Sequence, residues 1–225
     1  MKKGCTNRIC MEDLKEKVKN IRRDYVSKPL DESDLTKDPF DFFKKWLAEA
    51  IKAEIDEPNA FTLSTFGEQY PDSRIVLLRD FNKEGLSFYT NYDSKKAKDL
   101  ISHPFASINF FWVELFRQIR IKATVEKVSD KMSDDYFASR PRESQLGAWA
   151  SLQSEVLSSR AALETQLNQL EEKFKNKEVP RPENWGGYLL KPNYFEFWQG
   201  RPSRLHDRIV YEKNGEDWHI KRLYP

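Results

Sequence analysis

The strictest constraint on the fold is an alternating stretch in the middle of the chain, Arg117–Val128. Apolar residues occupy every second position from Ile119 to Val125, and polar or charged residues fill the positions between them. Successive side chains of a β-strand point to opposite faces of a sheet, so this pattern is typical of a half-buried antiparallel strand. The stretch therefore predicts a sheet with one face on a core and the other face polar.

Other segments extend this sheet. A two-residue Asn214-Gly215 turn predicts a hairpin of Asp207–Lys213 and Asp217–Leu223. Ser73–Asp80 is apolar on both faces, as a central strand requires. Further strands are predicted at Ala60–Thr65, Leu86–Thr90, Phe105–Trp112, Gly187–Leu190 and Tyr194–Gln199. Eight or nine strands are enough for an antiparallel sheet to close on itself, so we predict a mainly β fold with helices, a closed antiparallel barrel.

Helices are predicted between these strands from their apolar periodicity. Asp38-Pro39 is a cap followed by a proline at the first helical position, and it begins a helix that runs to about Ile55. Further helices are predicted at Met11–Tyr25, Ser94–His103, Ser129–Ser139, after Pro141, and at Ser158–Lys175. Residues 1–10 are expected to be disordered, and residues 11–225 to form a single domain.

Composition narrows the class of protein. The 225 residues carry 38 basic and 36 acidic side chains, and a net charge of +2 gives no general reason to expect a nucleic-acid partner. Cys5 and Cys10 lie outside any predicted core, which suits a reducing compartment. There is no signal-peptide pattern and no run of eighteen apolar residues that could span a membrane. A cytoplasmic protein is expected.

Several kinds of catalytic site have no matching motif. The chain lacks GxGxxG after a strand and lacks GxxxxGK followed by Ser or Thr, which argues against a Rossmann or P-loop nucleotide site. His103, His206 and His219, without paired cysteines, do not indicate a zinc site, and no metal is expected. Neither a GxSxG serine nor a cysteine near a histidine offers a nucleophile.

Local clusters of cations and hydroxyls indicate anion sites instead. Arg74 and the pair Lys95-Lys96 form one cluster, because lysines in the first turn of a helix oppose its dipole unless an anion lies nearby. Tyr136, Arg140 and Ser144 form another, since guanidinium and hydroxyl donors match phosphate oxygens. For either cluster alone, the ordinary explanation is that its cations form salt bridges at the protein surface. Together they suggest two phosphorylated small molecules, one of them a cofactor that supplies the redox chemistry.

The segment Tyr194–Arg208 has features of a lined pocket. An aromatic strand is followed by a turn with Gly and Pro, and Arg204, His206 and Arg208 then arrive within five residues. A hairpin whose arginines face solvent is the ordinary alternative, and these fifteen residues alone favour it.

Taken together, these motifs resemble the pyridoxine (pyridoxamine) 5′-phosphate oxidase family, from about Arg22 to Pro225. The matching segments are RIVLLR at 74–79, FYTN at 88–91, SRPRESQLGAW at 139–149, QSEV at 153–156, NWGGY at 184–188, FWQG at 197–200 and RLHDR at 204–208. The resemblance implies an FMN-binding, Greek-key split barrel and a homodimer with both active sites at the subunit interface. It implies oxidation of pyridoxine or pyridoxamine 5′-phosphate to pyridoxal 5′-phosphate by O₂, with release of H₂O₂, and of ammonia from the amine.

The resemblance also implies roles for individual residues. The expected FMN-binding residues are Arg74, Ile75, Val76, Leu77, Leu78, Arg79, Tyr89, Thr90, Lys95, Lys96, Gln118, Gln153, Ser154, Trp198 and Arg208. The expected substrate-binding residues are Arg22, Arg23, Asp24, Tyr25, Arg79, Tyr136, Arg140, Ser144, Arg204, Leu205 and His206. The segment 22–25 would belong to an N-terminal lid helix at residues 11–30, although charge at a helix C-terminus explains it on local grounds.

Three residues are candidates for the chemistry. Arg204 is too basic to accept a proton and would orient the substrate ring and stabilise charge, while His206 or a water would take the proton. A structural role for His206 fits equally well. Glu57 would assist near the substrate. Arg79 and Lys95 stand where the family usually has lysine and arginine, so charge is kept but reach and hydrogen-bond geometry change.

Two other functions fit part of this pattern. One is a split-barrel flavin reductase that acts on a different substrate, and the other is a carrier that binds FMN or pyridoxal phosphate without turnover. The cluster of Tyr136, Arg140 and Ser144 and the RLHDR segment argue against the reductase.

Overall fold

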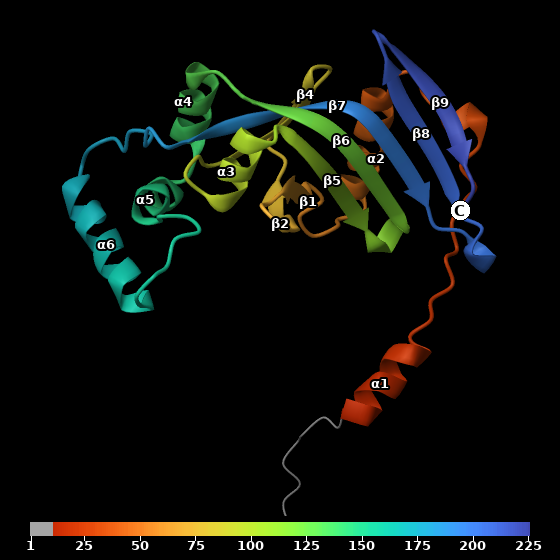
Figure 1. The fold of residues 1–225 in the computed structure, drawn as a ribbon, viewed down its shortest axis with the longest axis horizontal. Coiled ribbons are helices and arrows are strands. Elements are labelled where there is room, and N and C mark those ends of the chain that lie inside the picture. Colours follow the sequence, from red (N-terminus) through yellow and green to blue (C-terminus); the bar gives the residue numbers. More distant parts are fainter. Residues whose placement is uncertain (1–10) are drawn as a thin grey trace, which may run out of the picture.

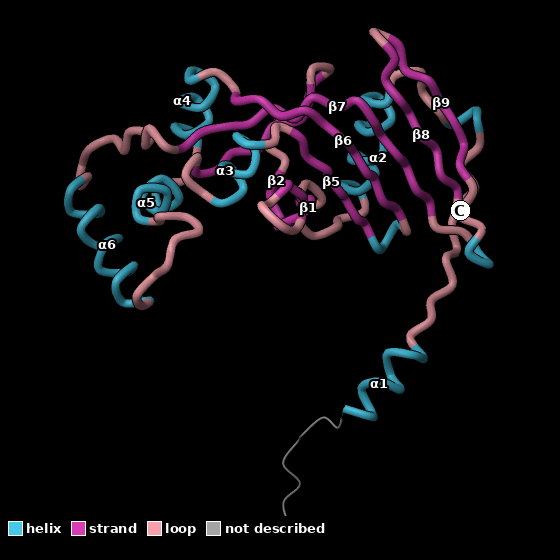
Figure 2. Tube along the Cα trace, viewed as in Figure 1, coloured by secondary structure: helices cyan, strands magenta, loops and turns pink. Residues whose placement is uncertain are grey.

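The computed structural model describes residues 11–225, which contain six α-helices and nine β-strands (Figure 1, Figure 2). The predicted disorder of residues 1–10 and both cysteines lie outside the described residues. The helices are α1 Met11–Asn20, α2 Pro39–Lys52, α3 Lys95–Ser102, α4 Asp130–Ser139, α5 Arg142–Ala150 and α6 Arg160–Lys173. The strands are β1 Ala60–Phe66, β2 Pro71–Leu77, β3 Asp80–Asn82, β4 Gly85–Asn91, β5 Phe105–Trp112, β6 Arg117–Lys127, β7 Trp185–Gln199, β8 Asp207–Asn214 and β9 Asp217–Leu223.

All nine strands belong to one antiparallel sheet. Their order is β2-β1-β5-β6-β7-β4-β3, and β8 and β9 continue the sheet beside β7. The alternating stretch is β6, and its residues from Ile119 to Val125 alternate between buried and exposed positions. The predicted combination of an antiparallel sheet with helices around it is confirmed. Among the described strands, β2 and β3 at the ends of this order do not pair with each other, so closure into a barrel stays a prediction.

Strand β7 corrects a predicted boundary. We expected two strands on either side of Pro192, but the structure has one strand of 15 residues. Pro192 lacks an N–H group, and it pairs with Ala123 where the register of β6 shifts between Lys122 and Ala123. Such a bulge tolerates an unpaired position, so the strand continues through the proline. The first half of β7 therefore pairs with β4 and the second half with β8.

Strand β2 was expected in the centre of the sheet, and this was wrong. Among the described strands it pairs with β1 alone, and Ile75 is 63% exposed. The apolar run does not reflect burial on both faces, because part of it lines the pocket described below. Leu78, just past the strand, is buried in the core. The three-residue strand β3 was missed, since it is too short to show a pattern.

The main core lies between the sheet and α2. The Asp38 carboxylate accepts a hydrogen bond from the Phe40 N–H, and Pro39 opens the helix, as predicted. Phe42 and Trp46 are fully buried and pack on Phe197 of β7, with ring centroids 4.5 and 5.3 Å apart. These aromatic contacts fix helix α2 against the second half of strand β7.

A second, smaller core joins α4, α5 and α6 to the beginning of β7. Its buried members are Phe137, Leu146, Phe174, Val179 and Trp185. Figure 1 shows these helices at one end of the sheet, with β8 and β9 at the other end. Predicted site residues lie at both ends of the sheet. Tyr136 and Arg140 belong to α4 and its C-terminal cap, and Arg208 belongs to β8.

The N-terminal helix is shorter than predicted. It ends at Asn20 rather than Tyr25, none of its residues is buried, and Figure 1 shows it projecting away from the sheet. A helix this short has little stability without a packing partner, which explains the early end. The tetrad Arg22–Tyr25 therefore lies outside any helix or strand, and residues 11–30 are not one lid helix. No helix within residues 11–225 is both long and apolar enough to cross a membrane.

The C-terminal hairpin is confirmed, with its turn shifted by one residue. Asn214 pairs with Asp217, so the loop is Gly215-Glu216 rather than Asn214-Gly215. Gly215 has φ of +61°, a conformation that glycine adopts without steric cost.

The glycine pair at the beginning of β7 gives a stability prediction. A Cβ atom at Gly187 would lie 2.7 Å from both the Tyr89 ring and the Val128 side chain. We expect Gly187→Ala to lower the free energy of unfolding by about 1–3 kcal/mol through overpacking. Gly147→Ala in α5 is the matched control, because its Cβ would meet nothing within 4 Å, and it should raise the free energy by about 0.5–1 kcal/mol. Chemical denaturation measures both, and equal effects would contradict the packing argument.

Candidate active site

A pocket of about 560 Å³ opens between β2, β4, α3 and α4. Its lining residues are Asp72, Ser73, Arg74, Ile75, Val76, Leu77, Arg79, Tyr89, Thr90, Lys95, Lys96, Tyr136, Arg140, Gln153, Ser154 and Trp185. All but Asp72, Ser73 and Trp185 were predicted from the sequence as cofactor or substrate residues. The structure therefore brings segments that are far apart in the chain into one cavity.

Lys96 is the most unusual cation in the pocket. It is only 8% exposed, and its Nζ donates to Thr90 Oγ1 at 3.1 Å, Ser94 Oγ at 3.2 Å and Gln153 Oε1 at 3.0 Å. These partners are neutral, so burial, followed by the nearby Arg74 charge, lowers the pKa of Lys96 to about 8. A buried ammonium without a carboxylate in contact is suited to an anion that enters from solvent.

Arg74 and Lys95 surround the same part of the pocket. The Arg74 guanidinium donates to Thr65 Oγ1 at 2.8 Å and pairs with the Asp72 carboxylate at 2.8 Å. Lys95 Nζ lies 3.4 Å from Asp72 and 3.5 Å from Asp99. Three cations thus face two carboxylates, and the first N–H groups of α3 add to the positive potential. We call Arg74, Lys95 and Lys96 the Lys96 group.

Arg140 is the centre of a second cationic group. It caps the C-terminus of α4, and its guanidinium carbon lies 4.5 Å from the centroid of the Trp185 ring. Its Nη1 is buried and has no hydrogen-bond partner among the described residues. Burial lowers the pKa of Arg140, and the Arg79 charge lowers it further. Tyr136, one turn earlier in α4, stacks on Tyr89 with centroids 3.9 Å apart. We call Arg79, Tyr136 and Arg140 the Arg140 group.

A separate row of predicted residues crosses three neighbouring strands. Gln118 of β6 pairs with Trp198 of β7, and Trp198 pairs with Arg208 of β8, so their side chains share one face of the sheet. Arg208 Nε donates to Glu196 at 2.9 Å, and Glu196 is 2% exposed. None of these residues lines the pocket. The structure thus brings this row together but does not join it to the Lys96 and Arg140 groups within one chain.

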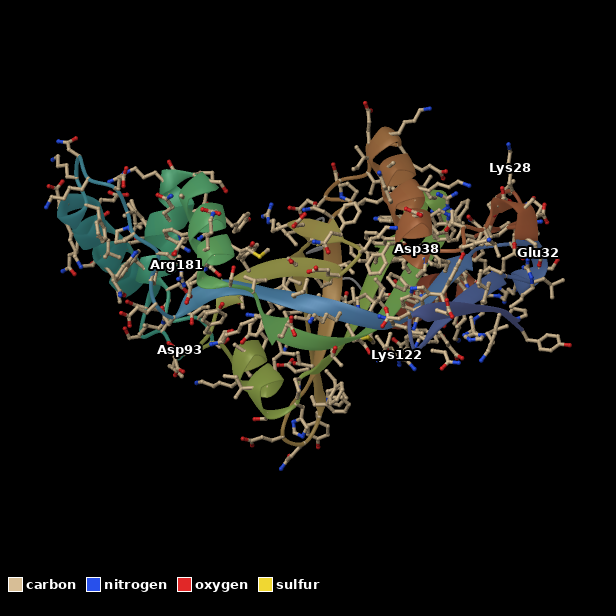
Figure 3. All side chains as sticks on the ribbon, turned by 90° about the horizontal axis from the view of Figure 1, so that it is seen from above. Lys28, Glu32, Asp38, Asp93, Lys122 and Arg181 are labelled. Atoms are coloured by element: carbon tan, nitrogen blue, oxygen red, sulfur yellow. The ribbon has the colours of Figure 1, made fainter. Side chains whose placement is uncertain are left out.

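His206 and Tyr25 lie beside this row. The rings of Tyr25 and His206 have centroids 5.4 Å apart, and Trp198 is 4.7 Å from His206. Arg23 lies over the Phe116 ring at 4.6 Å. In Figure 3, Arg181, near the beginning of β7, lies at one end of the molecule, and Lys28 and Glu32, which follow Tyr25 in the chain, lie at the other end. The N-terminal segment therefore covers the end of the sheet that carries His206.

The hydrogen bonding of His206 limits its chemistry. Its Nδ1 accepts a hydrogen bond from the Arg201 backbone N–H at 3.0 Å. Burial, followed by the Arg204 charge, lowers the pKa of His206, which favours the neutral ring. With Nδ1 accepting, the proton of the neutral ring is on Nε2, which is then a donor. In this arrangement His206 presents an N–H group and no lone pair to a ligand.

The remaining predicted residues lie outside the pocket. Glu57 is exposed in the turn before β1 with φ of +47°, and Leu78 is in the core. Arg204 and Leu205 are exposed in the connection between β7 and β8, where Arg204 has φ of +60°. Ser144 is half-buried on α5 and does not line the cavity.

Comparison with known proteins decides the family. Residues 47–174 match the family model described as pyridoxamine 5′-phosphate oxidase, and residues 185–225 match the model described as the pyridoxine 5′-phosphate oxidase C-terminal dimerisation region. The chain belongs to the pyridoxine/pyridoxamine 5′-phosphate oxidase family. The resemblance inferred from the motifs is thereby confirmed.

Members of this family are similar over nearly the whole chain. The pyridoxine/pyridoxamine 5′-phosphate oxidase of Thermosynechococcus vestitus is 50% identical over 210 residues, which are 93% of this chain and 99% of that protein. The corresponding protein of Burkholderia ambifaria is 48% identical, over 92% of this chain and 98% of that protein. Among solved structures, PhzG from Burkholderia lata in complex with tetrahydrophenazine-1-carboxylic acid has a TM-score of 0.83 and 30% identity, over 88% of this chain and 99% of that chain.

Within this family framework, the pocket contains one aromatic residue to which we had given no role. Trp185 was part of the NWGGY segment that carried the resemblance, but neither its position nor its type indicated a site residue. An aromatic residue at the beginning of a strand is ordinarily a core residue, and Trp185 is indeed 6% exposed. The signal that could have marked it is the adjacent glycine pair, which allows close approach of other groups.

Proposed function

We propose that the protein is an FMN-dependent oxidase that converts pyridoxine 5′-phosphate or pyridoxamine 5′-phosphate to pyridoxal 5′-phosphate. Electrons pass to O₂ with formation of H₂O₂, and the amine substrate also releases ammonia. The observation that carries the proposal is the presence of two cationic groups, the Lys96 group and the Arg140 group, in one pocket. Two phosphate esters can be bound there with their ring systems side by side.

The Lys96 group fits the phosphate of FMN. Lys96 has three neutral partners and a lowered pKa, and both features favour the arrival of an anion. Gln153, Thr90 and Ser154 would contribute further polar contacts, and the strand Ile75–Leu77 would follow the flavin ring with its backbone. The chemistry that a bound flavin supplies is acceptance of a hydride from the substrate carbon and reoxidation by O₂.

The Arg140 group fits the phosphate of the substrate. Arg140 has a buried, unpartnered Nη1, and a guanidinium can bind phosphate oxygens through two parallel hydrogen bonds. The Tyr136 hydroxyl and Arg79 would add a donor and a second charge, and Ser144 on the neighbouring helix α5 would add a hydroxyl. The phosphate would thus be bound away from the reacting carbon, so its binding orients the ring.

The row of Gln118, Trp198 and Arg208 would complete the site from a second copy of the chain. The row is half-buried on one face of the sheet and lies outside the pocket of its own chain. Residues 185–225 match a model described as a dimerisation region, and this match supports a homodimer. The segment Arg22–Tyr25, Arg204 and Leu205 would then approach the substrate across the interface, with the sheet arranged as a split barrel.

Arg204 would orient the substrate and stabilise charge, and a water would accept the hydroxyl proton. The tautomer of His206 supports water as the acceptor, because its Nε2 carries a proton and can only donate to the substrate. His206 would then be a binding residue. Glu57 would have to approach from its turn to assist.

His206→Asn tests this assignment. We expect a rise of about tenfold in KM for pyridoxine 5′-phosphate, from the loss of one hydrogen bond to a charged or polar group, and at most a threefold fall in kcat. FMN affinity should be unchanged. A fall of a hundredfold or more in kcat with loss of one limb of its pH profile would instead identify His206 as the base. Steady-state kinetics from pH 6 to 9 make the distinction.

A different substrate is the main alternative within this family. The structure of PhzG contains a tetrahydrophenazine carboxylic acid, which has a carboxylate and no phosphate. Two guanidinium groups and a tyrosine in the Arg140 group match a dianion better than a single carboxylate. This favours the phosphorylated substrate.

Oxygen uptake by the purified protein tests the proposed function. Yellow protein that consumes O₂ with pyridoxine 5′-phosphate and forms pyridoxal 5′-phosphate in equal amounts supports it. Yellow protein that oxidises a tetrahydrophenazine carboxylic acid but not the phosphate ester would overturn it in favour of the alternative substrate. Yellow protein without oxygen uptake would indicate a reductase or a carrier, and colourless protein that binds pyridoxal phosphate would indicate a carrier.

A further inference from the structure

The NWGGY segment places an indole at the floor of the pocket. Trp185 is the first residue of β7 and pairs with Asn91 of β4. Its ring is nearly parallel to those of Tyr136 and Tyr89, with interplanar angles of 7° and 13°. The three rings are close to parallel, their centroids lie within 6.1 Å of one another, and all three line the cavity.

Arg140 lies over the Trp185 ring of this group, and no carboxylate within residues 11–225 is paired with it. Its guanidinium carbon is 4.5 Å from the Trp185 centroid and 5.6 Å from the Phe137 centroid. Among the described residues its Nη1 has no hydrogen-bond partner. The guanidinium of Arg74, in the same pocket, already has partners, because it pairs with the Asp72 carboxylate and donates to Thr65 Oγ1.

We propose that Trp185 is a positioning residue for the substrate phosphate, which holds the Arg140 guanidinium by its π face and leaves the N–H donors of Arg140 available. This inference rests on the proposed function, which it deepens by assigning phosphate selectivity to a residue that does not itself touch the phosphate.

A half-buried guanidinium can be held by a carboxylate or by an aromatic face, and the two differ in what they leave for a ligand. A carboxylate would neutralise its charge and use the N–H groups that a phosphate needs. An aromatic face attracts the cation through the ring quadrupole and uses none of its hydrogen bonds. Among the residues that contact Arg140, Trp185 offers the largest such face. A ligand phosphate therefore meets a charged group whose donors are already oriented.

The surrounding contacts fix the indole itself. A Cβ atom at Gly186 would lie 2.2 Å from the Tyr92 hydroxyl and 2.9 Å from Ser133 Oγ, so the glycine allows α4 to pack on β7. Arg181 Nη1 donates to the Trp185 carbonyl at 2.7 Å, and its other nitrogens pair with Asp134 at 2.5 Å and Asp130 at 3.0 Å on α4 (Figure 3). The helix that carries Arg140 and the strand that carries Trp185 are thereby tied together.

Kinetics of Trp185→Leu and Trp185→Phe with phosphorylated and unphosphorylated pyridoxine test the proposal. For Trp185→Leu we expect KM for pyridoxine 5′-phosphate to rise about tenfold, with kcat within twofold, from loss of the cation–π contact. KM for pyridoxine should change less than twofold. Trp185→Phe keeps a smaller aromatic face and should raise KM for the phosphate ester less than threefold. The inhibition constant of inorganic phosphate should follow the same order.

Trp149→Leu is the matched control, because Trp149 packs against the same small core without contacting Arg140. It should leave both KM values unchanged. Equal KM increases for the two substrates, or no increase for either, would overturn the proposal.

If Trp185→Leu does not fold, Trp185→Phe decides the question. A KM increase confined to the phosphate ester supports the proposal, and wild-type values for KM and for phosphate inhibition overturn it. Absence of any oxidation by the wild type would refute the proposed function instead, and phosphate binding measured by calorimetry would still test Trp185.

Discussion

Arg140→Gln is expected to raise KM for pyridoxine 5′-phosphate by roughly two orders of magnitude, with a much smaller effect on kcat. Charge-assisted hydrogen bonds contribute about 1.5–3 kcal/mol each, and a guanidinium can make two to one phosphate. The buried Nη1 of Arg140 has no hydrogen-bond partner within residues 11–225, so no bond of this atom to the described chain has to be broken before the phosphate binds. Glutamine keeps a neutral N–H donor on a shorter side chain and removes the charge.

Steady-state oxygen uptake with both pyridoxine 5′-phosphate and pyridoxine measures this effect. The rise in KM should be confined to the phosphate ester, since pyridoxine has a neutral hydroxyl and no anionic group for Arg140 to bind. Arg160→Gln is the control, because Arg160 is exposed on α6 and pairs only with Glu164 among the described residues. A KM within threefold of the wild-type value, or an equal rise for both substrates, would contradict the assignment of Arg140.

Lys96→Met is expected to weaken FMN binding by about a hundredfold while it stabilises the protein without FMN. The ammonium would bind the flavin phosphate directly, and hydrogen bonds to a charged group contribute about 1.5–3 kcal/mol. Without an anion, the buried charge is a cost, and the lowered pKa of about 8 corresponds to a penalty on the order of 1–3 kcal/mol at pH 7. Thr90 and Gln153 remain hydrogen-bonded to each other at 2.9 Å without the lysine.

The pH dependence follows from the direction of this shift. The pKa of Lys96 is lower in the folded protein than in the unfolded chain, so the unfolded chain binds more protons between about pH 8 and the ordinary lysine pKa of 10.5. The contribution of this group to stability therefore rises with pH across that window. The stabilisation of FMN-free protein by Lys96→Met should be complete at pH 7 and should decrease between pH 8 and 10.5. FMN affinity of the wild type should fall above pH 8, as Lys96 loses its charge.

Flavin fluorescence titrations and denaturant unfolding of the FMN-free protein measure these two effects. Lys98→Met is the control, because Lys98 is on the same helix but exposed, with Glu155 as its ionic partner. Lys98→Met should change FMN affinity by less than twofold and the free energy of unfolding by less than about 0.5 kcal/mol. Loss of FMN affinity without gain of stability would contradict the claim that Lys96 is poised for an external anion.

The sequence predicted those parts of the fold that depend on local patterns. Strand β5 at Phe105–Trp112 and helix α4 after Ser129 have the predicted bounds, because alternation and a cap are encoded within a few residues. The position of β2 in the sheet and the continuity of β7 through Pro192 were not predictable in the same way. Both depend on which strand lies alongside, and a single segment carries no information on its neighbours.

The candidate site shows the same division. Motif residues such as Lys96 and Arg140 could be named from charge and spacing, and the structure places them in one pocket. Trp185 was missed because its contact with Arg140 spans 45 positions of the chain and leaves no local pattern. Trp198 and Arg208 lie outside the pocket of their own chain. Their proposed role depends on a second copy, which the sequence of one chain does not describe.

A crystal structure of the protein grown with FMN and pyridoxal 5′-phosphate tests most directly whether one pocket binds both esters. We predict the flavin phosphate within hydrogen-bond distance of Lys96 and Arg74, and the pyridoxal phosphate ester on Arg140 and Tyr136, with Trp198 and Arg208 of a partner subunit closing the site. Pyridoxal 5′-phosphate bound away from Arg140, or FMN bound outside the cavity of Lys96, would contradict the account.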